Sequence, residues 1–333
     1  MPQVRIGAPG GPAPPPIVIV APEGDLHARA VAHHLRELGS DVAIVDLGLM
    51  YEPSRGLSHR LARKGSDCDS AVIARADGRE TIDLSRAGTI WYRRPRLPRP
   101  PVLVVDGDCA FAAAEWNAAI DGLWATCPAR FVSDPACQRS ASKSRQLRVA
   151  ADVGLAIPDT LITSSAADAR AFVAQHGGRV IHKALTAPSD RFLATKRWSD
   201  ADAAALDDLP LAPTIFQEEV RGSIDLRITM IGERFFAADF PTSTLESPEA
   251  QWIDNRLILD FQYRKHALPA DVEAGLRTLT QGLGLSFGTI DMKIDASGEY
   301  VFLEINPQGQ FLYVEILTGL PLARTMAEFL MDG

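Results

Sequence analysis

The most informative segment of the chain is GTIDMKIDASGEYVFLEINP, residues 288–307. Alternating apolar and polar residues on both sides of Ser297-Gly298 predict two antiparallel strands joined by a two-residue turn. A turn at that dipeptide sets the register of the whole hairpin, because each step away from it pairs the next residue on either side. Counting outward places Asp291 directly opposite Glu304, with Asn306 two residues beyond.

The same register gathers oxygen atoms on one face of the hairpin. Glu304 and Asn306 share a face because side chains alternate along a strand, and Asn306 lies opposite Thr289. Asp291 and Glu304 are about 5 Å apart between Cβ atoms, and two carboxylates that close repel each other unless a cation lies between them. Hard oxygen ligands favour Mg²⁺, so we predict Asp291, Glu304 and Asn306 as magnesium ligands.

The hairpin has a simpler explanation as well, a half-buried pair of strands with a polar outer face. The predicted register also assumes that no β-bulge interrupts the strands. The residues expected on the apolar face of the second strand are Val301, Leu303 and Ile305.

Two lysines upstream are candidates for binding phosphate. Lys183 lies in an otherwise apolar strand, residues 180–185, where a buried ammonium is costly unless an anion compensates it. A phosphate would do so, and the alternative is a lysine that snorkels at the end of its strand. Lys143 lies on a predicted helix, where most lysines are solvated surface residues, so by itself it is a weaker indication.

Residues 225–232 predict a strand with one polar face. Asp225, Arg227 and Thr229 share that face, and Arg227 is therefore a candidate phosphate donor. The opposite face holds Leu226, Ile228 and Met230.

A hinge is predicted just before this strand. Gln217, Glu218, Glu219 and Val220 end a strand before Gly222, which suits a connection whose backbone meets the edge of an adenine. Further along, Arg256 is a candidate for another charge at the site. The alternative interpretation is that Arg256 forms a surface ion pair with Asp254.

The N-terminal third has the pattern of a parallel sheet. A buried strand at residues 17–20, a helix that ends at Gly39 and a second strand at residues 41–46 predict a βαβ unit. Its first turn, residues 21–25, lacks the glycine spacing that lets a backbone approach a pyrophosphate, so we exclude dinucleotide binding there. The basic segment 93–101 predicts either a solvated loop or a segment that faces a peptide or phosphate.

The remaining elements follow from helical and strand periodicity. Helices are expected at residues 110–126, 140–154, 166–176, 270–284 and 322–331, strands at 89–92, 158–163, 179–184 and 214–220, and hairpins at 225–240 and 288–306.

The composition limits the classes of function. The chain has 333 residues, a formal charge of -8 and a sequence pI near 5.4, which argues against a nucleic-acid partner.

The cysteines of the chain, at positions 68, 109, 127 and 137, show no metal or disulfide spacing and predict reduced thiols. No stretch predicts a signal peptide or membrane span, so we expect a cytoplasmic protein without a membrane partner. His176 and His182 have no partner spacing for catalysis.

The order of these residues resembles that of ATP-grasp ligases. Lys143, Lys183, the segment 217–220, Asp225-Leu-Arg227, Asp291 and the segment 303–307 follow one another as they do in that superfamily. Within it the chain is most similar to graspetide synthetases, the microviridin-type peptide maturases. The segments that carry this closer resemblance are Trp91-Tyr-Arg-Arg-Pro95, Asn306-Pro-Gln-Gly-Gln310 and Leu317-Thr-Gly-Leu-Pro321.

The resemblance implies a role for each candidate residue. Lys143 and Lys183 would contact ATP phosphates, residues 218–220 the adenine, and Asp225 the ribose. Arg227 and Arg256 would face the transferred phosphate or the substrate carboxylate, and the hairpin residues would bind Mg²⁺. Two segments depart from the family pattern, Asp254-Asn-Arg256 and Gln308-Gly-Gln-Phe311, and the phosphate loop expected at residues 186–195 has no glycine.

The resemblance also implies an α/β fold with a defined order of domains. We expect a disordered tail at residues 1–16, a Rossmann-like pre-ATP-grasp domain at 17–130, a small ATP-grasp subdomain at 131–215 and a large one at 216–333 that carries the metal hairpin.

The expected reaction is ligation through an acyl phosphate, with ATP and Mg²⁺ as cofactors. The expected substrate is a ribosomally made precursor peptide with a leader and an acidic core, in which side-chain esters or amides form, and we expect a homodimer. Two alternatives stay open: a ligase that adds a free amino acid to a peptide or small acid, and a nucleotide-binding regulator without turnover.

Overall fold

The computed structural model describes residues 15–52, 55–62, 70–74, 81–99, 106–186, 193–222, 224–241 and 262–332. The chain divides into two compact units. Unit 1 comprises residues 1–135 and 321–333, and unit 2 comprises residues 136–320. Within the described residues, no helix combines the length and the apolar character needed to cross a membrane.

Unit 1 is built on a four-stranded parallel sheet in the order β2-β1-β6-β7. Its strands are β1 (Ile17–Val20), β2 (Val42–Val45), β6 (Thr89–Tyr92) and β7 (Arg130–Val132). Helix α1 (Leu26–Glu37) connects the first two strands. It begins where the Asp25 side chain accepts a hydrogen bond from the Ala28 backbone N–H, and Gly39 follows it with a φ of 83°. The predicted βαβ unit is confirmed.

A second, three-stranded sheet in unit 1 was not predicted. It comprises β3 (Gly56–Arg60), β4 (Ser70–Ala74) and β5 (Thr81–Asp83). Ile73 and Ile82 of this sheet share a core with Ile90 of β6 and with Leu123 in the C-terminal part of α2 (Asp106–Thr126).

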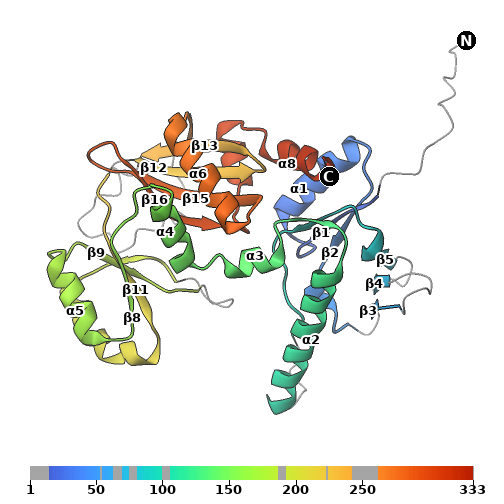
Figure 1. Ribbon diagram of the computed structural model, residues 1–333, viewed down its shortest axis with the longest axis horizontal. Helices are drawn as coiled ribbons and strands as arrows, with labels where there is room; N and C mark the ends of the chain where they lie inside the picture. Colours follow the sequence, from blue (N-terminus) through green and yellow to red (C-terminus); the bar gives the residue numbers. More distant parts are fainter. Residues whose placement is uncertain are drawn as a thin grey trace, which may run out of the picture. The chain divides into compact units, whose positions relative to one another are not determined.

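The last helix of the chain belongs to unit 1. Helix α8 (Leu322–Met331) packs beside α1 (Figure 1). The predicted large subdomain, 216–333, includes this helix, whereas the division into compact units groups it with the N-terminal residues. The predicted boundaries at 130/131 and 215/216 stay predictions.

The basic segment that begins at Arg93 is only partly a surface loop. Arg93 is fully buried, lies over the Trp91 ring at 5.7 Å from its centroid, and is 3.9 Å from Asp25. Burial lowers the pKa of Arg93 to about 10, against the opposing effect of Asp25. For this arginine both earlier interpretations are wrong, because it packs inside unit 1. The three cysteines in the described part, Cys109, Cys127 and Cys137, are thiols.

Unit 2 holds two antiparallel sheets. The first has the order β10-β9-β11-β8, with β8 (Thr160–Thr163), β9 (Val180–Lys183), β10 (Lys196–Arg197) and β11 (Thr214–Glu218). Helix α5 (Ala166–Gln175) and a 3₁₀ helix at Asp200–Leu211 cover it, and Phe172, Leu206 and Phe216 share their core. Strand β11 crosses the predicted boundary at 215/216 and pairs with β8 and β9.

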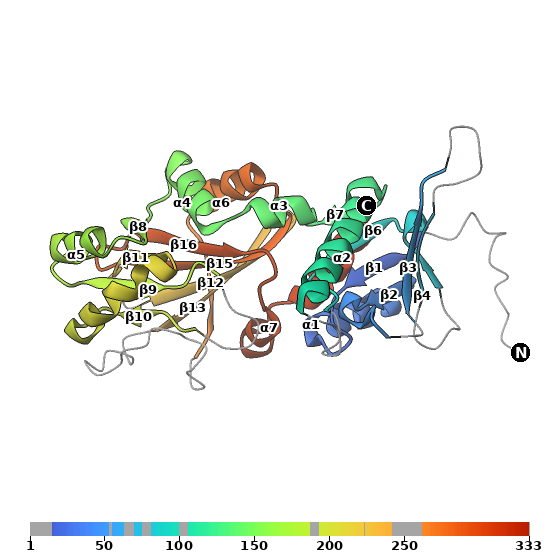
Figure 2. The same cartoon turned by 90° about the horizontal axis from the view of Figure 1, so that it is seen from below.

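The second sheet of unit 2 has five strands in the order β14-β13-β12-β15-β16. These are β12 (Ile224–Ile231), β13 (Arg234–Pro241), β14 (Arg264–His266), β15 (Phe287–Ile294) and β16 (Tyr300–Asn306). Helices α4 (Lys143–Asp152) and α6 (Ala270–Leu283) lie side by side on one face of it (Figure 2). Two short helices, α3 (Pro135–Ser140) and α7 (Leu312–Thr318), complete the unit.

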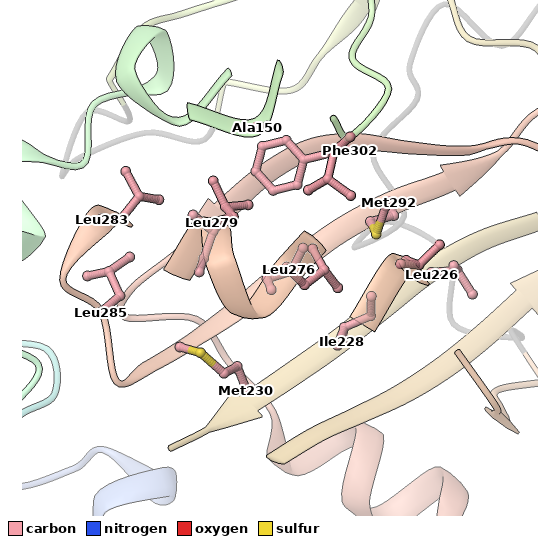
Figure 3. Packing of buried hydrophobic residues seen from close by; sticks show 14 of the residues in the cluster. Ala150, Leu226, Ile228, Met230, Leu276, Leu279, Leu283, Leu285, Met292 and Phe302 are labelled. Atoms are coloured by element: carbon pink, nitrogen blue, oxygen red, sulfur yellow. The ribbon is translucent and has the colours of Figure 1, made fainter. Parts of the chain in front are cut away.

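The hydrophobic core between these helices and the sheet occupies one face of the sheet and leaves the other face for a site. Leu276, Leu279 and Leu283 project from α6 toward the strands, where Leu226, Ile228, Met230 and Met292 meet them (Figure 3). The predicted apolar face of residues 225–232 is thereby confirmed. The polar residues of β12 and β15 lie on the opposite face of the sheet.

We predict that truncation inside this core is costly. Leu276 is 0% exposed, so Leu276→Ala should lower the free energy of unfolding by about 2–5 kcal/mol through lost burial and the cavity left behind. Chemical denaturation followed by circular dichroism measures this. Leu211→Ala is the matched control, because Leu211 is 84% exposed and its truncation should cost at most about 0.5 kcal/mol. Equal losses in the two variants would contradict this packing.

Candidate functional site

Three pairs of polar residues face each other across β12 and β15. The antiparallel register sets Asp225 opposite Lys293, Arg227 opposite Asp291, and Thr229 opposite Thr289. The three pairs follow one another along the strands on the face opposite the α6 core, so their side chains lie close together.

Arg227 and Asp291 form the central ion pair. Nη1 of Arg227 lies 2.6 and 2.7 Å from the two carboxylate oxygens of Asp291, and its Nη2 donates to the Gln310 carbonyl at 3.3 Å. Burial lowers the pKa of Arg227, but Asp291 outweighs burial and raises it above its ordinary value. Burial raises the pKa of Asp291, Arg227 lowers it and Glu304 raises it further, with a net upward shift. The Asp291 carboxylate would therefore be stabilised by additional positive charge.

Glu304 binds the two predicted phosphate lysines. Its Oε2 lies 3.3 Å from Lys143 Nζ and 3.8 Å from Lys183 Nζ, and Lys143 also donates to the Ala184 carbonyl at 3.4 Å. Burial raises the pKa of Glu304, but the two lysines outweigh burial and lower it. Lys183 has a lowered pKa because burial and the adjacent Lys143 disfavour its charge more than Glu304 favours it. An anion near Lys183 would therefore be favourable.

The hairpin pairs Asp291 with Glu304 as predicted, but its turn and the register of its strands differ from the prediction. The innermost pair is Ile294 with Tyr300, so the connection spans residues 295–299 and is longer than a two-residue turn. A register shift between Asp291 and Met292 then restores the predicted pairing of Asp291 with Glu304 and of Thr289 with Asn306. The assumption of an uninterrupted hairpin was wrong, and the two irregularities compensate for each other.

The bulge changes which residues of β16 are core residues. Phe302 pairs with Met292 and lies in the α6 core together with Ile305, whereas Val301 pairs with Lys293. Val301 therefore shares the polar face with Lys293. The prediction for Ile305 is confirmed, but Val301 and Leu303 are not among the residues of that core.

Asn306 lies at the exposed end of β16. Its Oδ1 accepts a hydrogen bond from the Gln308 backbone N–H at 2.9 Å. In the part of the chain that the structure describes, no group of three or more His, Cys, Asp or Glu side chains could hold a metal ion. The predicted set has two such acids and one amide, so a metal bound there would need oxygen ligands from another molecule.

The predicted hinge lies between the two sheets of unit 2. The Gln217 side chain is buried and donates to Thr160 Oγ1 at 2.9 Å, and Glu219 accepts from Arg197 Nε at 2.7 Å. The backbone N–H groups of Glu218 and Glu219 donate to the carbonyls of Asp159 and Arg179. Among the described residues Val220 N–H has no such acceptor, so it is the N–H of the segment best placed to meet a ligand.

Two parts of the predicted site lie outside the described residues. Arg256 and Asp254 fall within 242–261, and residues 187–192 interrupt the predicted phosphate loop. Of the histidines excluded from catalysis, His182 is a residue of β9 and His176 directly follows α5. His182 stacks on Phe216, and His176 lies 3.0 Å from Asp159.

Sequence reasoning missed two features of the site. Lys293 lies 2.7 Å from Asp225, and its position two residues after Asp291 on the same strand face could have indicated this. Tyr263 and Tyr313 have ring centroids 5.6 Å apart, and the Arg227 charge affects the Tyr263 hydroxyl. Burial, foremost, and Tyr313 raise the pKa of Tyr263, so its hydroxyl stays protonated. No sequence signal joins these two tyrosines.

Comparison with solved structures connects this geometry to known proteins. The macrocyclase MdnC from Microcystis aeruginosa MRC, solved with its precursor peptide MdnA, is 25% identical with a TM-score of 0.82, and the match covers 95% of this chain and 99% of that one. The macrocyclase MdnB from the same organism is 26% identical with a TM-score of 0.79, covering 96% and 100%.

A more distant neighbour was solved with a nucleotide. The ATP-grasp ligase PsnB, complexed with a minimal precursor, Mg and ADP, is 21% identical with a TM-score of 0.74, covering 98% of this chain and 99% of that one. No model of a known protein family matches the sequence, and a sequence comparison with curated proteins finds no match. The predicted ATP-grasp fold is confirmed, and the chain resembles ATP-grasp peptide macrocyclases.

We predict that the turn after β16 tolerates no side chain at position 309. A Cβ on Gly309 would overlap Thr289 Oγ1 and lie 2.6 Å from the Thr289 Cβ. Gly309→Ala must therefore displace the turn that holds Asn306 and the Gln310 carbonyl, and should lower the free energy of unfolding by about 1–3 kcal/mol. Thermal denaturation tests this. A Cβ on Gly107 meets nothing within 4 Å, so Gly107→Ala should not lower stability, and a loss as large as that of Gly309→Ala would refute the steric explanation.

Proposed function

We propose that the protein is a ligase that uses ATP and Mg²⁺ to activate a side-chain carboxylate of a precursor peptide and joins it to a hydroxyl or amine of the same peptide. The observation that carries the proposal is the network around Asp291 and Glu304. Burial lowers the pKa of Lys183 and raises that of Asp291, although each makes an ion pair. A magnesium nucleotide would bring negative charge to Lys183 and positive charge to Asp291.

The balance of charge supports an anionic ligand. Among the described residues of this network, the side chains of Lys143, Lys183, Arg227 and Lys293 face the carboxylates of Asp225, Asp291 and Glu304. The cations exceed the acids by one, in a protein whose formal charge is -8. A surplus of positive charge at one partly buried site of an acidic protein favours a polyanion there.

The nucleotide would lie along the edge between the two sheets of unit 2. Lys143 and Lys183 would contact its phosphates, because both already meet at one carboxylate oxygen. Residues 217–220 would hold the adenine, chiefly through the backbone at Val220, with Gln217, Glu218 and Glu219 shaping the segment. Asp225 would accept from the ribose.

Asp291, Glu304 and Asn306 fit a magnesium ion. Asp291 and Glu304 are directly paired across β15 and β16, and Asn306 lies two residues further along β16. Mg²⁺ is commonly bound by one or two carboxylates together with nucleotide phosphates. The ion would neutralise charge on the transferred phosphoryl group. Arg227 and Arg256 would face that group or the substrate carboxylate, and Arg227 Nε is buried with no hydrogen-bond partner among the described residues.

The chemistry needs no covalent enzyme nucleophile. Transfer of the γ-phosphoryl group of ATP to a carboxylate oxygen gives an acyl phosphate and ADP. Attack by a hydroxyl or amine on the acyl carbon then forms an ester or amide, loses a proton and releases phosphate. The protein's part is positioning, charge neutralisation and exclusion of water from the acyl phosphate.

The peptide substrate is inferred from the structural neighbours. MdnC was solved with a precursor peptide and is similar over nearly the full length of both chains. A leader would bind the enzyme, and an acidic core would be attracted by the basic network. The homodimer and the cytoplasmic location stay predictions.

We expect cross-linking to be visible as loss of water from a precursor peptide. Incubation of the purified protein with Mg²⁺, ATP and a leader-bearing peptide encoded beside its gene should lower the peptide mass by one water per cross-link, as measured by mass spectrometry. Asp291→Ala and Lys183→Ala should abolish the change. An unchanged mass with ATP consumption only on addition of a free amino acid would favour the intermolecular ligase, and nucleotide binding without turnover would favour the regulator.

We also expect Lys183→Met to change metal and nucleotide binding in opposite directions. The variant loses a phosphate contact, so its affinity for Mg·ADP should fall about tenfold or more. Glu304 loses a competing cation, so Mn²⁺ without nucleotide should bind more tightly. Calorimetry measures the first and electron paramagnetic resonance of free Mn²⁺ the second. Lys265→Met, at an exposed position of β14, should change neither, and weaker binding of both ligands to Lys183→Met would argue against the shared site.

A further inference from the structure

A second buried ion pair lies one step along the strands from Arg227 and Asp291. Lys293 of β15 is directly opposite Asp225 of β12, and its Nζ lies 2.7 Å from Asp225 Oδ1. The two side chains are 12% and 9% exposed. The pair is thus more buried than the contacts between Glu304 and the two lysines, where the side chains are 13–33% exposed.

A pair of this kind is a poor device for stability alone. Removing two charges from water costs several kcal/mol per ion, and well-packed apolar residues of similar size are often as stable or more stable. Asp225 also adds a third carboxylate beside Asp291 and Glu304, and its charge contributes to the raised pKa of Asp291. A carboxylate kept in so unfavourable a place is better explained by a ligand than by folding.

We infer that Lys293 is a positioning residue for nucleotide binding, which orients the Asp225 carboxylate to accept a hydrogen bond from a ribose hydroxyl. This inference rests on the proposed function. Asp225 lies five residues after Val220, the end of the predicted adenine segment, so it is near enough along the chain to meet the sugar attached to that base.

The chemistry of the pair suits this role. A carboxylate has about four acceptor sites, so it can accept from a lysine and from a hydroxyl at the same time. A hydrogen bond from a hydroxyl to a carboxylate is also stronger than one to a neutral acceptor. Without the contact from Lys293 Nζ to Oδ1, the Asp225 side chain would be held less firmly in the orientation that meets a ribose hydroxyl.

The position of Lys293 distinguishes it from the phosphate lysines. Lys143 and Lys183 converge on Glu304, whereas Lys293 pairs with Asp225 and with Val301 across the neighbouring strands. Its loss should therefore affect recognition of the sugar specifically, beyond any general loss of positive charge.

The test compares ADP with its 2′-deoxy and 3′-deoxy analogues by calorimetry, in the presence of Mg²⁺. The wild-type protein should bind ADP about tenfold or more tightly than the analogue that lacks the contacted hydroxyl, as expected for loss of a hydrogen bond to a charged group. In Lys293→Met this ratio of affinities should fall to about twofold or less. The affinity for ADP falls because the hydrogen bond and the charge are both lost, whereas the affinity for that analogue falls only because of the lost charge.

Two further variants keep the test decisive. Lys265→Met removes an exposed lysine from the same sheet and should keep the wild-type ratio. Lys293→Met removes the cation beside the buried Asp225 carboxylate, which lowers stability. The double variant Asp225→Asn/Lys293→Met removes both charges, avoids that penalty, and should likewise lose the ratio.

The outcomes separate this inference from the proposed function. A ratio that stays at its wild-type value in Lys293→Met or in the double variant overturns the role of Lys293 and leaves nucleotide binding intact. A wild-type protein that binds ADP but does not discriminate against either analogue overturns the inference in the same way. Absence of ADP binding to the wild-type protein overturns both.

Discussion

The geometry of the site depends on strand β15, because this strand pairs with β12 along one edge and with β16 along the other. Asp291 is thereby held between Arg227 and Glu304. The opposite face of the same strands packs against α6. A slip of one residue would move the charges into the core and the apolar residues out of it, so the register of the core and the geometry of the site are specified by the same alternation.

Much of this arrangement could be predicted because its signals are local. The alternation in residues 225–232 assigns Arg227 to the site and Leu226 to the core, and the alternation in residues 288–294 does the same for Asp291. The glycine that follows α1 and the apolar strand before it likewise indicate the parallel sheet. The order of the charged residues along the chain then led to the ATP-grasp fold.

The rest could not be predicted because it depends on contacts that no periodicity encodes. The bulge in β16 places Phe302 in the core, where the alternation predicts its neighbours Val301 and Leu303. The position of the bulge is determined by packing alone. Arg93 looked like part of a solvated loop, but its guanidinium lies beside Trp91 and Asp25, of which Asp25 is far away in sequence. Alternation places Lys293 on the same face as Asp291, but it does not identify Asp225 of another strand as its partner. Arg256 lies outside the described residues.

The grouping of α8 with the N-terminal residues has a consequence for biosynthesis. Unit 2 is inserted into unit 1, since residues 136–320 separate the first strands from the helix that packs beside α1. A ribosome releases the chain from the N-terminus onward, so unit 2 can assemble its sheets while unit 1 still lacks α8. The side of α1 that packs beside α8 thus stays incompletely covered until residues 322–331 have left the exit tunnel.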